Sequence, residues 1–416
     1  MALFGRRRLG RHLLVAAGLL LAVCVFVVAR NWETFATMYA NVTAMNEGSR
    51  VAESIRRPDD LLGYLADHPE RTSLVAYEVG ARGNGLFYQS DERRPVVNTS
   101  HLLLLAEYAR RVETGQMAPD RPVPLDSLDV YALPGAGLSN HREVLAHWRD
   151  KGRLRPDSTV ALRHVVEAIP RFGDPTAADW LLTALGRVEG QSLPERWGLD
   201  HSDPPLPGSG VYLSWIPALS DGPSDATRRF RSTTRAAYTE HAYRLARRLR
   251  RDSAFRARTR QRLRRRGSGL SLPDQRRLAQ STSPKGTAAD YADLLARSLH
   301  GRLGSDTVST FVRRQLESPV ESDSLDAPIA AIGTDVGALP GVISFVGYVR
   351  YADDRPPRVA ALFLEDLPMG LFYHVLQTSL DKGLLLRLLT DPDFFRRAKT
   401  QLSSREPTSS PSASSP

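Results

Sequence analysis

Four polar side chains, three of which could do acid–base or nucleophilic chemistry, come just before an amphipathic helix that is predicted at residues 102–112. In order they are Asn98, Thr99, Ser100 and His101. A histidine can act as a base near neutral pH, but it needs a nucleophile within reach, and Asn98, one helical turn earlier, has no ionisable oxygen. Because each step along a helix turns a side chain by about 100°, Thr99 and Ser100 should not point into the same pocket as Asn98. We therefore expect Asn98 to cap the helix by accepting its free N–H groups.

Along the chain, the sequence around this stretch predicts two strands, then a series of helices, then three more strands. Residues 72–79 and 86–88 have β-type composition and flank a Gly-rich turn, which predicts a hairpin. Helical periodicity follows at residues 160–168, 177–185, 270–279 and 287–303. Three more strands are predicted at 329–332, 342–351 and 358–364, before a closing amphipathic helix at 372–389.

Length and composition permit one large domain or two ordinary ones, since the chain has 416 residues. The lone cysteine, Cys24, excludes disulfides and a cysteine-based metal site. The net charge of +10 arises from one segment of the chain. Residues 228–266 contain sixteen arginines and only two acids, which gives this segment a charge of +14. The rest of the chain therefore has a net charge of −4. The basic pI therefore describes one segment and does not indicate a general nucleic-acid-binding surface.

The N-terminus predicts export. Four arginines within residues 1–11 precede a continuous apolar run of 17 residues, 13–29. Such a run can just span a bilayer as a helix, and the arginines place residues 1–11 in the cytoplasm. We expect residues 12–30 to be an uncleaved transmembrane anchor in a bacterial cell membrane, with the main domain on the periplasmic or extracellular side. The alternative is a signal peptide cleaved near Ala29, which would release a secreted protein.

Three segments of the chain resemble motifs of the penicillin-recognising serine hydrolases, in particular the class A β-lactamases. Residues 98–109 are similar to the family's S-T-x-K-L-L-x-L-A-x-Y-A, residues 171–180 to its R-Y-S-x-N elbow, and residues 335–341 to its K-G-G-S-L-P-G segment. The resemblance implies an α/β (α+β) fold with a five-stranded antiparallel sheet, flanking helices and an inserted all-helical domain.

This resemblance also implies a domain organisation. A juxtamembrane helix at 31–57 leads into a β-lactamase-like domain at 58–402, and a disordered Ser/Pro tail follows at 403–416. The domain's sheet part would comprise residues 58–97 and 325–402. Its helical part would comprise residues 98–324 and include an Arg-rich helix at 226–266.

The family's catalytic groups are replaced in all three motifs. Family members have a nucleophilic Ser and a Lys one turn later, then a Ser-Asp-Asn elbow, then a Lys on a strand. The corresponding positions here are Asn98, His101, Gly173, Asp174, Pro175, Asp335 and Gly337. Exchanging two lysines for a neutral His and an Asp would shift the pocket by three charge units, each worth on the order of 1–4 kcal/mol at contact distance. A carboxylate-bearing substrate would then be repelled.

These losses predict a catalytically inactive pseudoenzyme that acts as a binding or scaffolding module at the cell envelope, with no cofactor. The alternative is an active serine hydrolase, performing acyl transfer on a β-lactam, peptide or ester, whose nucleophile lies elsewhere. A metal enzyme is disfavoured because the histidines lack ligand spacing and are expected to be surface or core residues. They are His101, His141, His147 and His164.

The Arg-rich segment indicates a partner. Its apolar residues recur at helical spacing, so one face should dock and the other should expose arginines, either simply to solvent or to a partner. The candidate contacts are Arg247, Arg248, Arg250 and Arg251. The partner expected there is anionic lipid headgroups or a cell-wall polymer, and no nucleic acid is expected for an exported domain.

Overall fold

The computed structural model describes residues 32–219, 230, 233–318 and 329–404. Its centre is an antiparallel sheet with the order β2-β1-β10-β9-β8-β7. The bounds are β1 Thr72–Glu78, β2 Leu86–Tyr88, β7 Glu317–Ser318, β8 Ile329–Leu339, β9 Val342–Tyr351 and β10 Arg358–Leu364. The five predicted strands are confirmed, although β8 is longer than expected, and the two-residue β7 extends the sheet at its β8 edge.

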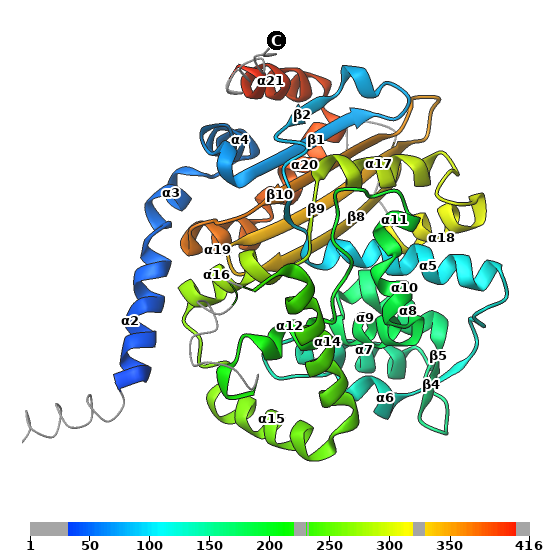
Figure 1. Cartoon of the computed structure of the whole chain (residues 1–416). Helices are drawn as coiled ribbons and strands as arrows, with labels where there is room; N and C mark the ends of the chain where they lie inside the picture. The colour runs from blue at the N-terminus through cyan, green and yellow to red at the C-terminus, as the bar shows by residue number, and fades with distance from the viewer. Residues whose placement is uncertain (1–31, 220–229, 231–232, 319–328, 405–416) are drawn as a thin grey trace, which may run out of the picture.

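Helices cover both faces of the sheet, so its central strands are apolar on both sides (Figure 1). One face packs against α4 (Pro58–Asp67), α19 (Met369–Thr378), α20 (Leu380–Thr390) and α21 (Pro392–Ser403). The opposite face packs against α17 (Ala288–Leu299) and α18 (Asp306–Leu316) and joins the core of the helical part. The predicted helical part, 98–324, therefore includes two helices that belong in space to the sheet.

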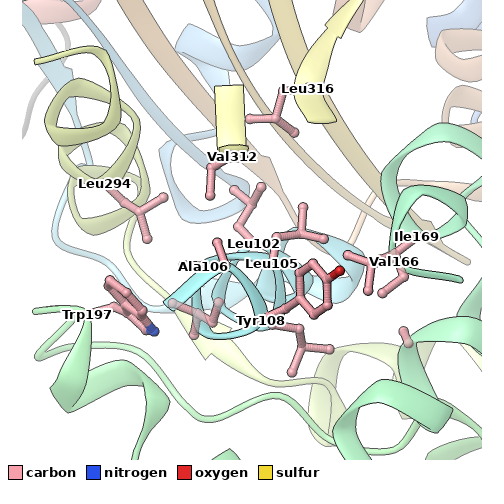
Figure 2. Close-up of a cluster of buried hydrophobic side chains, with 14 of the residues drawn as sticks. Leu102, Leu105, Ala106, Tyr108, Val166, Ile169, Trp197, Leu294, Val312 and Leu316 are labelled. Carbon is pink, nitrogen blue, oxygen red and sulfur yellow. The ribbon is translucent and has the colours of Figure 1, made fainter. Parts of the chain in front are cut away.

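The helix after the candidate motif, α5 (Leu102–Glu113), lies at the centre of the molecule. Its first eight residues are all buried, and Figure 2 shows its side chains surrounded by residues from other helices and by Trp197, which follows α11 (Leu193–Arg196). The labelled neighbours are Val166, Ile169, Trp197, Leu294, Val312 and Leu316. The expected amphipathic helix is therefore buried on every side over its first two turns, as its run of four leucines at 102–105 permits.

The helical part is inserted into the sheet through two short strands. The chain leaves the sheet at β3 (Arg94–Pro95) and returns at β6 (Lys285–Gly286), and these two strands pair with each other. A second small pair joins β4 (Pro122–Pro124) to β5 (Thr159–Ala161). The helices between are α6 Leu125–Asp129, α7 Leu138–Asp150, α8 Leu162–Phe172, α9 Pro175–Leu185, α10 Arg187–Gln191, α11 Leu193–Arg196, α12 Gly208–Ser214, α14 Arg235–Arg251, α15 Ser253–Arg266 and α16 Leu272–Thr282.

Two helices predicted as continuous are broken by local chemistry. The Arg-rich helix is divided into α14 and α15 at Asp252, whose side chain accepts the N–H of Phe255 and so caps a new helix. The closing helix is divided into α19 and α20 at Ser379, which adopts a left-handed conformation with φ 53°.

The juxtamembrane helix is also in two pieces, α2 (Trp32–Asn46) and α3 (Ser49–Ser54). They meet at Gly48, where a Cβ would lie 2.7 Å from the backbone nitrogen of Leu371. This close approach to α19 is possible only for glycine.

The predicted membrane anchor at 12–30 and most of the tail at 403–416 lie outside the described residues. Within the described part of the chain, no helix has the length and apolarity needed to cross a bilayer.

Candidate functional site

The candidate motif forms a 3₁₀ turn, η3 (Val97–His101), directly before α5. A 3₁₀ helix has about three residues per turn, so Asn98 and His101 lie on the same side of it, and both line a cleft of about 340 Å³. The expectation that Asn98 caps α5 is wrong. The N-cap position belongs to His101, and neither η3 nor α5 has a side-chain cap, because the extra turn separates Asn98 from the free N–H groups of α5.

The two hydroxyls of the motif differ in their orientation. Ser100 belongs to the lining of the cleft, but its hydroxyl is not directed into it. Its hydroxyl donates to the carbonyl oxygen of Val97 at 2.8 Å, and the residue is only 1 % exposed. Thr99 is turned into the core, where its hydroxyl donates to Ser344 Oγ at 3.1 Å. Neither oxygen is presented to the cleft as a free nucleophile.

The elbow between α8 and α9 forms the second side of the cleft. Gly173 ends α8 in the left-handed conformation, with φ 57° and ψ 37°. Asp174 is fully buried: one carboxylate oxygen accepts the N–H of Thr176 at 2.9 Å and the other lies 3.0 Å from Nδ1 of His141. Pro175 is the first residue of α9, which suits its missing N–H. Asp174 and Pro175 therefore shape the elbow and cap α9.

Two side-chain amides flank the place where the family's elbow serine would stand. A Cβ built on Gly173 would lie 3.8 Å from Nδ2 of Asn140 and 4.0 Å from Nδ2 of Asn98, so the space there is open. Asn140 is held by a hydrogen bond of 2.8 Å to the carbonyl oxygen of Phe172. Sequence reasoning missed Asn140, because the residue comes from the start of α7 and no motif surrounds it.

Among the described residues, no Lys or Arg lines the cleft. Burial lowers the pKa of His101 to about 4, so the imidazole is neutral at pH 7. The one acid in the lining is Asp179, which accepts the N–H groups of Gly208 at 2.6 Å and Ser209 at 2.8 Å. Burial raises the pKa of Asp179 to about 6. Its sequence signal is weak, since Asp179 lies in the segment 171–180 at a position for which the family's motif specifies no residue.

Two aromatic residues also line the cleft, Tyr212 of α12 and Trp215 directly after its end. The hydroxyl of Tyr212 donates to the carbonyl oxygen of Pro134 at 3.3 Å and so joins α12 to the loop before α7. No pattern in the sequence distinguishes these two aromatics from core residues.

Two residues of the third motif, Asp335 and Gly337, lie beneath the turn and outside the cleft lining. Gly337 of β8 packs against η3, since a Cβ there would lie 2.5 Å from the backbone nitrogen of Asn98. Asp335, on the same strand, is paired in register with Val346, and its Oδ2 has no hydrogen-bond partner among the described residues. The residues of this segment that do line the cleft are Ala338, Leu339 and Pro340.

Asp335 does not carry the full negative charge that the sequence suggested. Burial raises the pKa of its carboxyl to about 7, so the group is about half protonated at neutral pH. The expected shift of three charge units is therefore too large. The cleft has still lost both positive charges of the family's lysines.

Comparison with known proteins supports the same family. The model of the β-lactamase enzyme family (Beta-lactamase2) matches residues 56–369. The chain belongs to the β-lactamase enzyme family. Among solved structures, a variant of the class A β-lactamase of the last common ancestor of Gram-negative bacteria is 15 % identical, with 79 % of this chain and 96 % of that chain covered and a TM-score of 0.47. A search of curated proteins gave no match.

A second solved structure is the β-lactamase from Sphaerobacter thermophilus, which is 17 % identical. The comparison covers 77 % of this chain and 96 % of that chain, with a TM-score of 0.46.

Elsewhere in this β-lactamase family protein, three of the four predicted contact arginines, Arg247, Arg250 and Arg251, are exposed. Arg248 is different: it is half-buried, with its guanidinium 4.2 Å from the centre of the Phe255 ring. His141 is buried and lies between two aspartates. Among the described residues, no three His, Cys, Asp or Glu side chains are placed to hold a metal ion.

Replacing Asp335 with asparagine should stabilise this β-lactamase family protein at alkaline pH. A carboxyl whose folded pKa is raised to about 7 stabilises the fold fully below about pH 3.8 and loses that contribution as the pH rises to 7. Because Asp335 is only half-buried by surface area, we expect Asp335→Asn to raise the free energy of unfolding by about 1–2 kcal/mol at pH 8 and by almost nothing at pH 4. Urea unfolding at both pH values measures the difference. An equal effect at the two values would contradict the assignment.

Proposed function

We propose that this β-lactamase family protein is an exported, membrane-anchored pseudoenzyme whose cleft serves binding or scaffolding instead of acyl transfer. One observation carries the proposal. The cleft brings together Asn98, His101, Gly173 and Pro175, the residues that replace the family's nucleophile, base and elbow, and its lining in the described part of the chain includes no Lys or Arg.

The chemistry of these groups supports the absence of acyl transfer. The amide of Asn98 has no hydroxyl to attack a carbonyl carbon, and a serine nucleophile needs a base to take its proton. His101 is a weak base because its pKa is lowered to about 4. A carboxylate-bearing substrate would also meet amides and aromatic rings in place of a lysine.

The alternative function is an active serine hydrolase with a displaced nucleophile. The observation that favours it is the position of Ser209, which lines the cleft beside Asp179. A carboxyl with a pKa near 6 has the basicity that general-base catalysis uses near neutral pH. Ser209 is only 5 % exposed, so its hydroxyl would have to become accessible before it could be acylated.

Covalent labelling separates the two functions. The full-length chain is incubated with a fluorescent penicillin and, separately, with a fluorophosphonate, and adducts are located by mass spectrometry. We expect no adduct with either reagent, whereas an adduct on Ser209 would establish the alternative. An active class A β-lactamase is the positive control for both reagents.

Restoring the family's residues provides a complementary test. Because positions 98, 101 and 173 share one cleft, the variant Asn98→Ser/His101→Lys/Gly173→Ser should acquire slow acylation at residue 98. The serine at 173 has room for its Cβ but must adopt a left-handed conformation, which costs about 1 kcal/mol. The matched control is Gly173→Ser alone, which should remain unlabelled.

The membrane anchor is tested independently of the cleft. Membranes from cells that express the full chain are washed with alkaline carbonate, and the retained protein is analysed by N-terminal sequencing. An integral protein that still carries its first residues supports the anchor, and a soluble protein that begins just after Ala29 supports secretion.

A further inference from the structure

A group of exposed arginines on α14 and α15 has no acidic partner among the residues that the structure describes. We call it the arginine face, and its members are Arg244, Arg247, Arg251, Arg258, Arg264 and Arg265. None of them forms an ion pair with an acid among the described residues. The two acids of this region are already used: Glu240 pairs with Arg187 at 2.5 Å, and Asp252 caps α15.

The spacing of the arginine face concentrates its charge. Arg244, Arg247 and Arg251 are three and four residues apart on α14, opposite the buried side that contains Leu245 and Leu249. Like charges at this spacing destabilise a helix. α14 and α15 carry thirteen arginines between Arg235 and Arg266 and only two acids, so the protein itself leaves this repulsion largely uncompensated.

The arginine face differs from the set that the sequence suggested. Arg248 stacks on Phe255 and so contributes to packing. Arg250 lies with Arg187 and Tyr243 around a small side pocket. The exposed charge extends instead along α15, where Arg258, Arg264 and Arg265 lie opposite the buried Thr259 and Leu263.

The position of α15 relative to the start of α2 indicates what these arginines meet. α2 begins at Trp32, three residues after the apolar run 13–29, and three residues span at most about 11 Å. In the anchored protein, the beginning of α2 therefore lies close to the bilayer surface. In Figure 1, α2 begins at the lower end of the molecule, and α15 lies at that same end.

We infer that the arginine face docks on anionic lipid headgroups of the bilayer that anchors the chain. The inference rests on the proposed membrane anchor and adds a second, electrostatic attachment to it. Arginine binds phosphate oxygens through charge-assisted, often bidentate hydrogen bonds. Each arginine held close to an anionic surface strengthens attachment about fivefold, and the attraction extends only about 8 Å at physiological salt.

The test uses the full-length chain in nanodiscs made of phosphatidylcholine alone or of phosphatidylcholine with phosphatidylglycerol. Exposed arginines are modified with phenylglyoxal, and each site is quantified by mass spectrometry. We expect Arg258, Arg264 and Arg265 to react about fivefold more slowly in the anionic nanodiscs, and raised salt to abolish the difference. Arg396 of α21, at the opposite end of the molecule, is the internal control and should react equally in both.

Charge reversal tests whether the arginine face is the surface that contacts the anionic lipid. Arg244 and Arg251 of the arginine face should also react more slowly with phenylglyoxal in anionic nanodiscs. In the variant Arg258→Glu/Arg264→Glu/Arg265→Glu, this protection of Arg244 and Arg251 from phenylglyoxal should disappear. The matched control, Arg355→Glu/Arg396→Glu/Arg397→Glu, makes the same change in net charge elsewhere and should preserve that protection. Loss of protection in both variants would show an effect of net charge alone and would overturn the assignment of the surface.

The remaining outcomes separate this inference from the anchor. Retention in both kinds of nanodisc with equal arginine reactivity would refute the docking and leave the anchor intact. A chain that does not insert refutes the anchor, and co-sedimentation with anionic vesicles then decides whether the arginine face binds lipid by itself. Stronger protection of the same arginines by a DNA duplex or by a phosphate-rich wall polymer would also overturn the inference.

Discussion

Replacing Arg94 with methionine is expected to lower the free energy of unfolding by about 3–5 kcal/mol, because it breaks a buried and fully hydrogen-bonded ion pair. The Arg94 side chain is 4 % exposed and lies 2.6 Å from the carboxylate of Glu365. Its guanidinium also donates to Ser73 Oγ and to the carbonyl oxygens of Pro69, Glu70 and Thr72. Methionine fills a similar volume and leaves all of these acceptors without their donor.

Urea-induced unfolding of the Arg94→Met variant provides the measurement. Arg355→Met is the matched control, since Arg355 is exposed and its contacts, an ion pair with Asp353 and the ring of Tyr351 at 4.2 Å, lie at the surface, so its effect should stay below about 1 kcal/mol. Arg94→Lys keeps the positive charge but lacks the planar guanidinium group with its several N–H donors. It should therefore recover only part of the lost free energy of unfolding. If the methionine variant unfolded at the wild-type midpoint, the buried pair would not stabilise the fold.

The stability of the protein should also fall between pH 6.5 and 9 because of His141. Burial alone would lower the pKa of this imidazole, but hydrogen bonds with Asp129 and Asp174, 3.0 Å away on either side, raise it to about 9. A raised histidine pKa stabilises the fold fully below the unfolded value of about 6.5 and loses that contribution as the pH rises through 9. Because Asp129 is partly exposed, we expect a loss of about 2–3 kcal/mol.

Chemical denaturation at pH 7, 8, 9 and 10 follows this loss, and the variant His141→Gln should flatten the profile. The raised carboxyl pKa values of Asp179 and Asp335 act mainly below about pH 7, so they contribute little in this window. His164→Gln is the control, since burial lowers the pKa of that histidine and it should not titrate there. A wild-type profile that is already flat above pH 7 would contradict the charged state of His141.

The order of strands and helices was predictable because burial on both faces makes β9 and β10 continuous apolar runs with clear ends. The elbow at Gly173 and Pro175 was also recognisable, since a left-handed glycine and a helix-starting proline are local features. These parts of the fold depend on neighbours in the sequence, which a single chain reveals.

The sequence did not predict features that depend on distant segments. The 3₁₀ form of η3 follows from its packing on Gly337 of β8, more than two hundred residues later. The raised pKa of His141 depends on the simultaneous approach of Asp129 and Asp174. The raised pKa of Asp335 results from burial, and burial cannot be assigned to one residue before the fold is known.

The pairing of β3 with β6 has a mechanical consequence. The helical part is joined covalently to the sheet only through these two strands, and they are hydrogen-bonded to each other at Arg94 and Gly286. A rotation of the helical part about this double strand would displace the distant α15 more than Ser283 and Pro284, the residues of the cleft lining beside β6. A tilt of this kind would therefore be smallest at the part of the cleft that these two residues form.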